Sequence, residues 1–208
     1  NIKVVGDGVT IRDPDRTFVD MDVTVGKDTV IYPGTWLEGR TVVGENCELG
    51  PNSRFTNTEI GNHVTACFSY AHDCRIGDGV TMGPYVHLRP DTEISAHVKI
   101  GNFVEVKNSK IGEASKLPHL SYIGDSDVGK DVNIGCGVVF VNYDGLNKHR
   151  SVVGDGAFIG CNSNLISPIN IEAGSYVAAG STITRNVPSG ALYVARAKDR
   201  IIEGWVEK

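Results

Sequence analysis

Residues 76–106 read IGDGVTMGPYVHLRPDTEISAHVKIGNFVEV, and an apolar side chain returns at every sixth position of this stretch. The recurring residues are Ile76, Met82, Leu88, Ile94, Ile100 and Val106. Neither the period of a helix nor the strict alternation of a long strand explains this spacing. A fixed internal period indicates a repeat architecture, in which each repeat buries its apolar face only against its neighbours.

The period of six continues through most of the chain. Further runs are Val25, Ile31, Leu37, Val43, Leu49 and Phe55; Ile111, Leu117 and Ile123; Val128, Ile134 and Phe140; and Val153, Ile159, Leu165, Ile171, Val177 and Ile183. One-residue slips separate 106 from 111 and 123 from 128. Glycine directly follows 12 of these 24 positions, and small or β-branched residues such as Thr29, Thr35 and Cys47 come four residues after them. We interpret the pattern as a hexapeptide repeat.

The repeat predicts an all-β fold, a parallel β-helix with three short strands and about 18 residues in each coil. The first apolar residue of each hexad points inward, and glycine relieves the sharp corners. The 24 hexads predict eight coils and a rod of roughly 40 Å, at about 4.8 Å per coil. We expect a single domain over 1–208, with an N-terminal cap at 1–24, repeats over 25–187, a loop at 141–152 and a tail at 188–208.

Composition excludes several classes of protein. The chain has 20 Lys and Arg against 25 Asp and Glu, so it lacks the uniformly basic surface of a nucleic-acid binder. It contains no run of about 18 apolar residues, so we expect no membrane span. Its five cysteines form no Cys-x-x-Cys pair, which argues against a structural zinc site and fits a reducing cytoplasm. The sequence begins at Asn1 without Met or an apolar signal segment, so we expect a piece of a longer chain.

The register of the repeat places two cations together. Arg89 and Lys107 each follow an inward apolar residue, and an interval of 18 residues puts them on adjacent coils about 4.8 Å apart. Like charges at that separation repel unless an anion lies between them. The pair is therefore either a clamp for a phosphate group or two solvated surface cations.

A second column combines a histidine with small side chains. His119, Cys136, Cys161 and Ala179 each come two residues after an apolar position of one face. A column of small residues leaves a groove along the rod, which suits a long, thin ligand arm, with His119 as a candidate base at one end. The alternative is that small residues merely suit the tight corners of the coil.

The repeat is interrupted once, between Phe140 and Val153. Residues 142–150 read NYDGLNKHR, a polar segment that contains glycine. A polar loop that leaves a rigid rod is a common place for function, and the alternative is a flexible spacer.

Five motifs together carry a resemblance to a known family. They are LRP at 88–90, IGNFVEVK at 100–107, HLSYIGD at 119–125, NYDG at 142–145 with Asn147 and Lys148, and AAGST at 178–182. Over nearly the whole chain the sequence resembles the C-terminal acetyltransferase domain of the bifunctional bacterial UDP-N-acetylglucosamine pyrophosphorylase/glucosamine-1-phosphate N-acetyltransferases. The family's N-terminal nucleotidyltransferase half is absent from these 208 residues, so we expect its activity to be absent too.

The resemblance implies a left-handed parallel β-helix that forms a cytoplasmic homotrimer. It also implies acetyl transfer from acetyl-CoA to glucosamine 1-phosphate, with no metal, for the synthesis of UDP-N-acetylglucosamine and cell-wall precursors. Transferred to this sequence, His119 would be the general base. The sugar phosphate would contact Arg89, Lys107, Tyr122 and Lys148, and the sugar would contact Asn133 and Asn142. The coenzyme would contact Cys136, Asn142, Tyr143, Cys161, Ala179 and Arg196.

One departure from the family bears on the coenzyme. Val138 stands where the family frequently has Thr, so we expect a hydroxyl near the thioester carbonyl to be lost. Two other functions remain open on the sequence. The chain could be a non-catalytic β-helix that trimerises or regulates a sugar nucleotidyltransferase, or it could acetylate another amino sugar.

Overall fold

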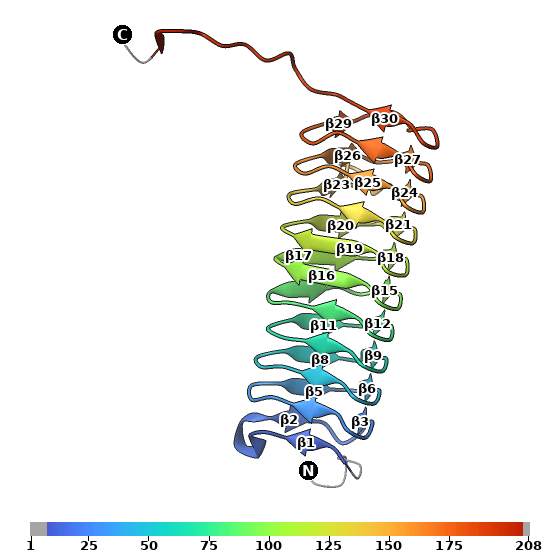
Figure 1. Ribbon diagram of the computed structural model, residues 1–208. Helices are drawn as coiled ribbons and strands as arrows, with labels where there is room; N and C mark the ends of the chain where they lie inside the picture. Colours follow the sequence, from blue (N-terminus) through green and yellow to red (C-terminus); the bar gives the residue numbers. More distant parts are fainter. Residues whose placement is uncertain (1–7, 206–208) are drawn as a thin grey trace.

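The computed structural model describes residues 8–205, so residues 1–7 of the expected cap and 206–208 of the expected tail lie outside the described residues. Short strands stack into a straight rod with three faces, and the coils wind in a left-handed sense (Figure 1). One short 3-10 helix, η1 (Pro14–Arg16), lies in the first coil. Between residues 8 and 205, no helix is long and apolar enough to cross a membrane.

Each face of the rod is one parallel sheet, named here sheets I, II and III. Sheet I contains β1 (Thr10–Ile11), β4 (Val30–Ile31), β7 (Glu48–Leu49), β10 (Thr65–Ala66), β13 (Thr81–Met82), β16 (Lys99–Asn102), β19 (Lys116–His119), β22 (Asn133–Ile134), β25 (Phe158–Ile159), β28 (Tyr176–Val177) and β30 (Leu192–Tyr193). Sheet II contains β2 (Phe18–Val19), β5 (Trp36–Glu38), β8 (Arg54–Thr56), β11 (Tyr70–His72), β14 (Val86–Leu88), β17 (Val104–Lys107), β20 (Tyr122–Gly124), β23 (Val139–Val141), β26 (Asn164–Ile166) and β29 (Thr182–Ile183). Sheet III contains β3 (Thr24–Val25), β6 (Val42–Val43), β9 (Glu59–Ile60), β12 (Cys74–Ile76), β15 (Thr92–Ile94), β18 (Lys110–Ile111), β21 (Ser126–Val128), β24 (Ser151–Val153) and β27 (Asn170–Ile171).

Each strand pairs with the strand one coil away on the same face, as Leu88 does with Val106. This pairing confirms the predicted parallel β-helix. The predicted number of coils was wrong. Sheet III has nine strands, and Val187 bridges to Ile171 on the same face after β28 and β29, so residues 8–205 contain ten coils instead of eight. One coil's worth of missed positions is formed by the buried residues Ile60, Ala66 and Ala71, which are reached partly by five-residue steps that hide the period of six. The other comes from the two ends of the rod, where β1, β2 and Val187 complete the first and last coils.

The expected N-terminal cap takes part in the sheets. Strands β1 and β2 pair with β4 and β5, so the described part of 1–24 forms the first coil. At the other end, β30 still pairs with β28 before the chain leaves the rod (Figure 1).

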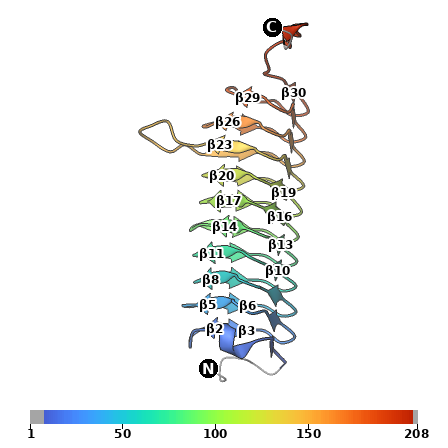
Figure 2. The same ribbon diagram turned by 90° about the vertical axis from the view of Figure 1, so that its left-hand side faces the viewer.

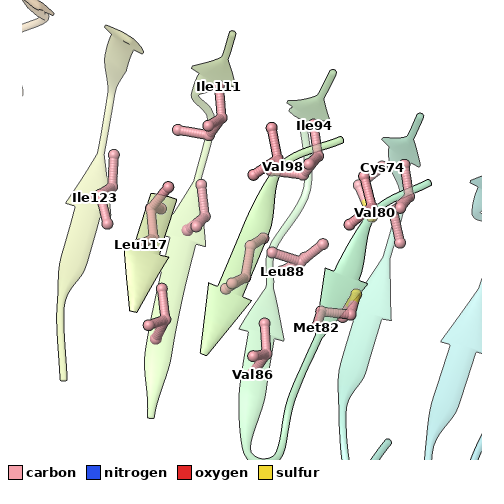
Figure 3. Packing of buried hydrophobic residues seen from close by; sticks show 14 of the residues in the cluster. Cys74, Val80, Met82, Val86, Leu88, Ile94, Val98, Ile111, Leu117 and Ile123 are labelled. Carbon is pink, nitrogen blue, oxygen red and sulfur yellow. The ribbon is translucent and has the colours of Figure 1, made fainter. Parts of the chain in front are cut away.

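The core is a single column of stacked apolar side chains inside the coils (Figure 3). All 24 predicted inward positions are buried. Leu117, directly before the site described below, is fully buried, and truncating such a residue to alanine typically costs about 2–5 kcal/mol. The rod therefore holds its surface side chains on a rigid base.

Val138 corrects one expectation. It is fully buried at the fourth position after Ile134, the same inward-facing corner position as Thr29 and Thr35. The side chain therefore does not face a ligand groove, and the expected loss of a hydroxyl beside a thioester was wrong. In another coil, the buried hydroxyl of Thr41 donates to the carbonyl oxygen of Glu38 at 2.7 Å, and Val138 simply replaces a polar corner residue with an apolar one.

Candidate active site

The corner between sheets I and II carries the histidine column. Backbone hydrogen bonds join its members from coil to coil: Gly137 N to His119 O (3.4 Å), Asn162 N to Cys136 O (2.7 Å) and Gly180 N to Cys161 O (2.8 Å). Each member therefore lies directly over the one before it. The structure brings His119, Cys136, Cys161 and Ala179 into one line along the rod.

Arg196 lies at the far end of this column. Gly180 directly follows Ala179 and has a φ of +73°. A methyl group on Gly180 would lie 3.7 Å from Cδ of Arg196, so the arginine side chain passes over the last turn of the column. The exposed guanidinium thus ends a strip of small residues that begins at His119.

A groove also extends from His119 in the opposite direction. It is lined by Cys67, Gly83, Gly101, Pro118 and His119. Glycine is required at 101, because a Cβ atom there would overlap the carbonyl oxygen of Pro118. His119 therefore stands part-way along a shallow channel.

The ring of His119 is held by a residue that the sequence analysis missed. Asn102 lies opposite His119 on the neighbouring strand, and its Oδ1 is 2.6 Å from Nδ1 of the histidine. An amide oxygen only accepts, so Nδ1 donates its proton to Asn102, and in the neutral imidazole the lone pair then lies on Nε2. The signal was present in the register, because Asn102 follows Ile100 by two residues and so belongs to the same column.

The predicted cation pair occupies sheet II. The backbone N–H of Arg89 donates to the carbonyl of Val106, which places the side chains of Arg89 and Lys107 on adjacent coils. Each cation has a carboxylate partner. Nη1 of Arg89 is 2.9 Å from Oε1 of Glu105, and Nζ of Lys107 is 3.7 Å from Oδ1 of Asp125. Arg89 and Lys107 are therefore not two freely solvated surface cations, because a carboxylate holds each of them in place.

Asp125 joins several of these residues and was also missed. It is only 6% exposed, and Nδ2 of Asn108 donates to its Oδ1 at 2.6 Å. Its Oδ2 accepts from Nδ2 of Asn142. Burial raises the pKa of the Asp125 carboxyl, but these two hydrogen bonds and the charges of Lys107 and Lys148 outweigh burial and lower it. Asp125 is therefore a carboxylate at neutral pH.

Tyr122 and Asn142 meet above a glycine. Nδ2 of Asn142 is 3.4 Å from the hydroxyl of Tyr122. A Cβ atom at Gly124 would overlap both groups, so this position must lack a side chain. Gly124 pairs with Lys107 in the coil below, and the two polar groups therefore lie beside the lysine.

The interruption of the repeat is an ordered hairpin that projects from the rod after β23 (Figure 2). Tyr143 pairs with Lys148 in an antiparallel bridge. At the tip, the Asp144 carboxylate accepts from the backbone N–H of Asn147 at 2.6 Å and lies 2.6 Å from Nε2 of His149. The flexible-spacer interpretation was wrong, because these bonds fix the loop.

The hairpin is anchored at its base by Arg150. Its guanidinium pairs with Asp127 at 2.5 Å and donates to the carbonyl of Asn108 at 2.9 Å. The anchored loop carries Lys148 to Lys107, and contact with the Lys107 ammonium lowers the pKa of Lys148.

Asn133 is the predicted residue that the fold does not bring to this cluster. It lies on sheet I opposite Lys116, in a hollow that also contains His97 and Lys99. The remaining candidates for sugar-phosphate contact lie on sheet II or in the hairpin. Within one chain, the candidate residues are therefore divided between two faces.

A separate cavity of about 700 Å³ on sheet III contains none of the predicted site residues. Its three cations each pair with a carboxylate: Arg75 with Glu59 (3.0 Å), Lys110 with Glu93 (3.4 Å) and Arg150 with Asp127 (2.5 Å). Two further carboxylates, Asp73 and Asp91, also line the cavity. Among the residues from 8 to 205, no group of three or more His, Cys, Asp or Glu is arranged to hold a metal ion.

Comparison with known proteins supports the repeat. Residues 73–108 match the family described as bacterial transferase hexapeptide (six repeats). These 36 residues are a match to six bacterial transferase hexapeptide repeats. Two solved structures are similar to this chain in fold alone. One is LpxA, a UDP-N-acetylglucosamine acyltransferase from Bacteroides fragilis (TM-score 0.63, 14% identity, 86% of this chain and 69% of that one). The other is the UDP-N-acetylglucosamine acyltransferase of Francisella novicida (TM-score 0.59, 17% identity, 89% and 67%).

Other proteins match this chain at much higher sequence identity than these two solved structures do. It is 56% identical to the bifunctional protein GlmU of Geobacillus sp. (strain WCH70), over 97% of this chain and 44% of the relative. It is 51% identical to the bifunctional protein GlmU of Clostridium beijerinckii, over 100% of this chain and 46% of the relative. The chain thus spans less than half the length of these relatives, and the resemblance inferred from its motifs is confirmed.

Proposed function

We propose that this hexapeptide-repeat chain transfers the acetyl group of acetyl-CoA to the amino group of glucosamine 1-phosphate. The observation that carries the proposal is the pairing of Nδ1 of His119 with Asn102 at 2.6 Å, which leaves Nε2 free to accept a proton. The cluster around Lys107 and the identity with GlmU proteins support it further. A purely structural rod would need neither an oriented histidine nor a cluster of fixed cations.

The phosphate end of the acceptor is assigned to Arg89, Lys107 and Lys148. Two lysines and an arginine suit a phosphate dianion, because charge-assisted hydrogen bonds are stronger than neutral ones. Tyr122 and Asn142, which meet over Gly124, supply polar contacts to the same molecule.

The reaction needs one proton acceptor. Nε2 of His119 takes a proton from the amine as the amine nitrogen attacks the thioester carbonyl carbon. The new N–C bond replaces the C–S bond, and the proton passes to the departing sulfur. The products are N-acetylglucosamine 1-phosphate and CoA, and no covalent intermediate on the protein is required.

The small-residue column fits the pantetheine arm of the cosubstrate. The arm would extend from His119 past Cys136, Cys161 and Ala179. Arg196 at the end of the column would meet the phosphates, and Tyr143 of the hairpin is assigned to the same ligand. The proposed reaction is a step in the synthesis of UDP-N-acetylglucosamine and cell-wall precursors. We propose that it takes place in the cytoplasm.

We propose further that the active unit is a homotrimer. Four bulky apolar residues stack along the corner between sheets I and II: Phe68, Tyr85, Phe103 and Leu120, which are 36–58% exposed. The rings of Tyr85 and Phe103 lie 5.2 Å apart at an interplanar angle of 8°. An apolar ridge of this kind is typical of an interface. A neighbouring copy on this ridge would also offer a way to bring Asn133 of one chain to the sheet II cluster of another.

The function is tested by incubating the purified chain with acetyl-CoA and glucosamine 1-phosphate and measuring thiol release. We expect release that depends on both substrates and falls by about 10²–10⁴ in His119→Ala. No release by the unmodified chain would leave the non-catalytic trimerisation module as the better explanation. Release with a different amino sugar would retain the chemistry and change the acceptor.

A further inference from the structure

Asp125 lies at a corner whose backbone does not require a carboxylate. The corner between sheets II and III is turned by a ladder of five residues with positive φ: Asn57 (48°), Asp73 (49°), Asp91 (61°), Asn108 (45°) and Asp125 (49°). Asn and Asp tolerate this left-handed conformation better than other non-glycine residues. Since Asn occupies two of the five corners, the fold accepts either amide or acid at this position.

The contacts of Asp125 do require a carboxylate. Asn108 and Asn142 each donate through Nδ2, one to each oxygen of Asp125. A carboxylate has two acceptor oxygens, whereas an amide has only one. An amide at 125 would therefore turn an NH2 group toward one of these donors.

The charge of Asp125 is also used. Lys107 and Lys148 carry like charges side by side, and the Asp125 carboxylate lies 3.7 Å from Nζ of Lys107. Two adjacent ammonium groups repel each other, and a buried carboxylate next to them offsets that repulsion. The same carboxylate thus reaches the hairpin through Asn142 and Lys148 and the rod through Lys107 and Asn108.

We propose that Asp125 is a positioning residue of the acetyl-transfer site, which fixes the amide of Asn142 and the arrangement of Lys107 and Lys148 around the sugar phosphate. This rests on the proposed function. Asp125 is buried behind these groups, so it acts through them and has no contact with the acceptor itself.

The principal test is Asp125→Asn, which preserves side-chain size and the corner conformation. We expect kcat/KM for glucosamine 1-phosphate to fall at least tenfold, mainly through KM. The alkaline limb of its pH profile should move to lower pH, because Lys148 loses a nearby negative charge. The matched control is Asp73→Asn at an equivalent corner, where Asp73 accepts from Asn57 at 3.1 Å; its kcat/KM should stay within twofold of the unmodified chain.

A second measurement does not depend on turnover. In ¹⁵N NMR spectra of the whole chain, the side-chain NH2 of Asn142 should exchange slowly with water and lose this protection in Asp125→Asn but not in Asp73→Asn. If the unmodified chain releases no thiol, the proposed function fails, while the NMR comparison still tests the role of Asp125. Unchanged protection of the Asn142 amide overturns the positioning role.

A double variant tests the route of the effect. If Asp125 acts largely through Asn142, the double variant Asp125→Asn/Asn142→Ala should have a kcat/KM less than threefold below that of Asn142→Ala alone. Fully multiplicative losses in the double variant would show that Asp125 acts independently of Asn142 and would contradict this part of the proposal.

Discussion

Nδ1 of His119 lies 2.6 Å from Oδ1 of Asn102, the residue opposite it on the preceding coil. The stacking of coils thus places a fixed acceptor beneath a surface histidine. One tautomer of the imidazole is stabilised, and the other ring nitrogen is left as a base.

Removing the hydrogen-bond acceptor that Asn102 provides to His119 should impair turnover more than substrate binding. We expect Asn102→Ala to lower kcat about tenfold to a hundredfold, because the Asn102 side chain orients the proposed base His119. KM for acetyl-CoA and KM for glucosamine 1-phosphate should change little. Asn102→Asp is the matched variant. It keeps an acceptor and adds a negative charge, which favours protonated His119, so the acid limb of kcat should move to higher pH. A kcat for Asn102→Ala equal to that of the unmodified chain would refute the orienting role.

Crowding above Gly124 should affect acceptor binding. Gly124→Ala places a methyl group against the Tyr122 hydroxyl and the Asn142 amide, so KM for glucosamine 1-phosphate should rise at least fivefold. The control is Gly190→Ala, where φ is +67° and no heavy atom lies within 4 Å. That variant should lose about 1 kcal/mol of stability through backbone strain and keep its KM. Thermal unfolding and thiol-release kinetics distinguish the two effects.

The cysteines should differ sharply in reactivity at pH 8. Cys161 is exposed on the proposed coenzyme column, and Cys136 is partly exposed. Burial raises the pKa of Cys74 to about 12, so its reactive thiolate is scarce. We expect maleimide to modify Cys161 first, to stop thiol release and to be slowed by acetyl-CoA, as read by peptide mass spectrometry. Rapid labelling of Cys161 with full retention of activity would contradict its place on the coenzyme column.

The alkaline side of the pH profile should depend on Lys148. Its ammonium attracts the phosphate only while protonated, and contact with Lys107 lowers its pKa from the usual 10.5. KM for glucosamine 1-phosphate should therefore begin to rise at a pH below that expected of an isolated lysine. In Lys107→Met, KM for glucosamine 1-phosphate should be higher at every pH. The pH at which this KM begins to rise should move upward, because Lys148 no longer has a positive neighbour that lowers its pKa. A shift in the opposite direction would exclude Lys148 as the titrating group.

A charge on the apolar ridge should weaken self-association. Tyr85→Lys places an ammonium between Phe68 and Phe103, so sedimentation equilibrium should show lighter species than the unmodified chain at the same concentration. Val42→Lys, on the exposed face of sheet III, is the control and should sediment normally. If both variants form the same trimer, the ridge is not the interface.

The fold was predictable because inward residues recur at a nearly fixed interval. The interval failed between Phe55 and Ile76, where the steps to Ile60, Ala71 and Ile76 are five residues long and the small side chains of Ala66 and Ala71 further masked a coil. Val138 could have been assigned correctly, since it stands four residues after Ile134, at a position that is buried in other coils as well.

The site was predictable only where register alone decides neighbours. The alignment of His119 with Cys136 follows from counting residues along stacked coils. Register also places Asn102 below His119, but it does not show that the two side chains are hydrogen-bonded, and no spacing rule specifies the hydrogen bond between Asn108 and Asp125. The approach of Lys148 to Lys107 depends on the path of an irregular hairpin, which lies outside the repeat.

The constant rise from coil to coil also fixes how far each residue lies from the first coil. His119 belongs to β19, which opens the seventh coil of the rod, so six coil rises separate it from β1, or roughly 29 Å at about 4.8 Å each. Because a coil contacts only the coils above and below it, inserting or deleting one whole coil would move the proposed reaction centre in discrete steps while its local surroundings stay intact. The distance of His119 from the first coil can therefore change while the residues around His119 stay the same.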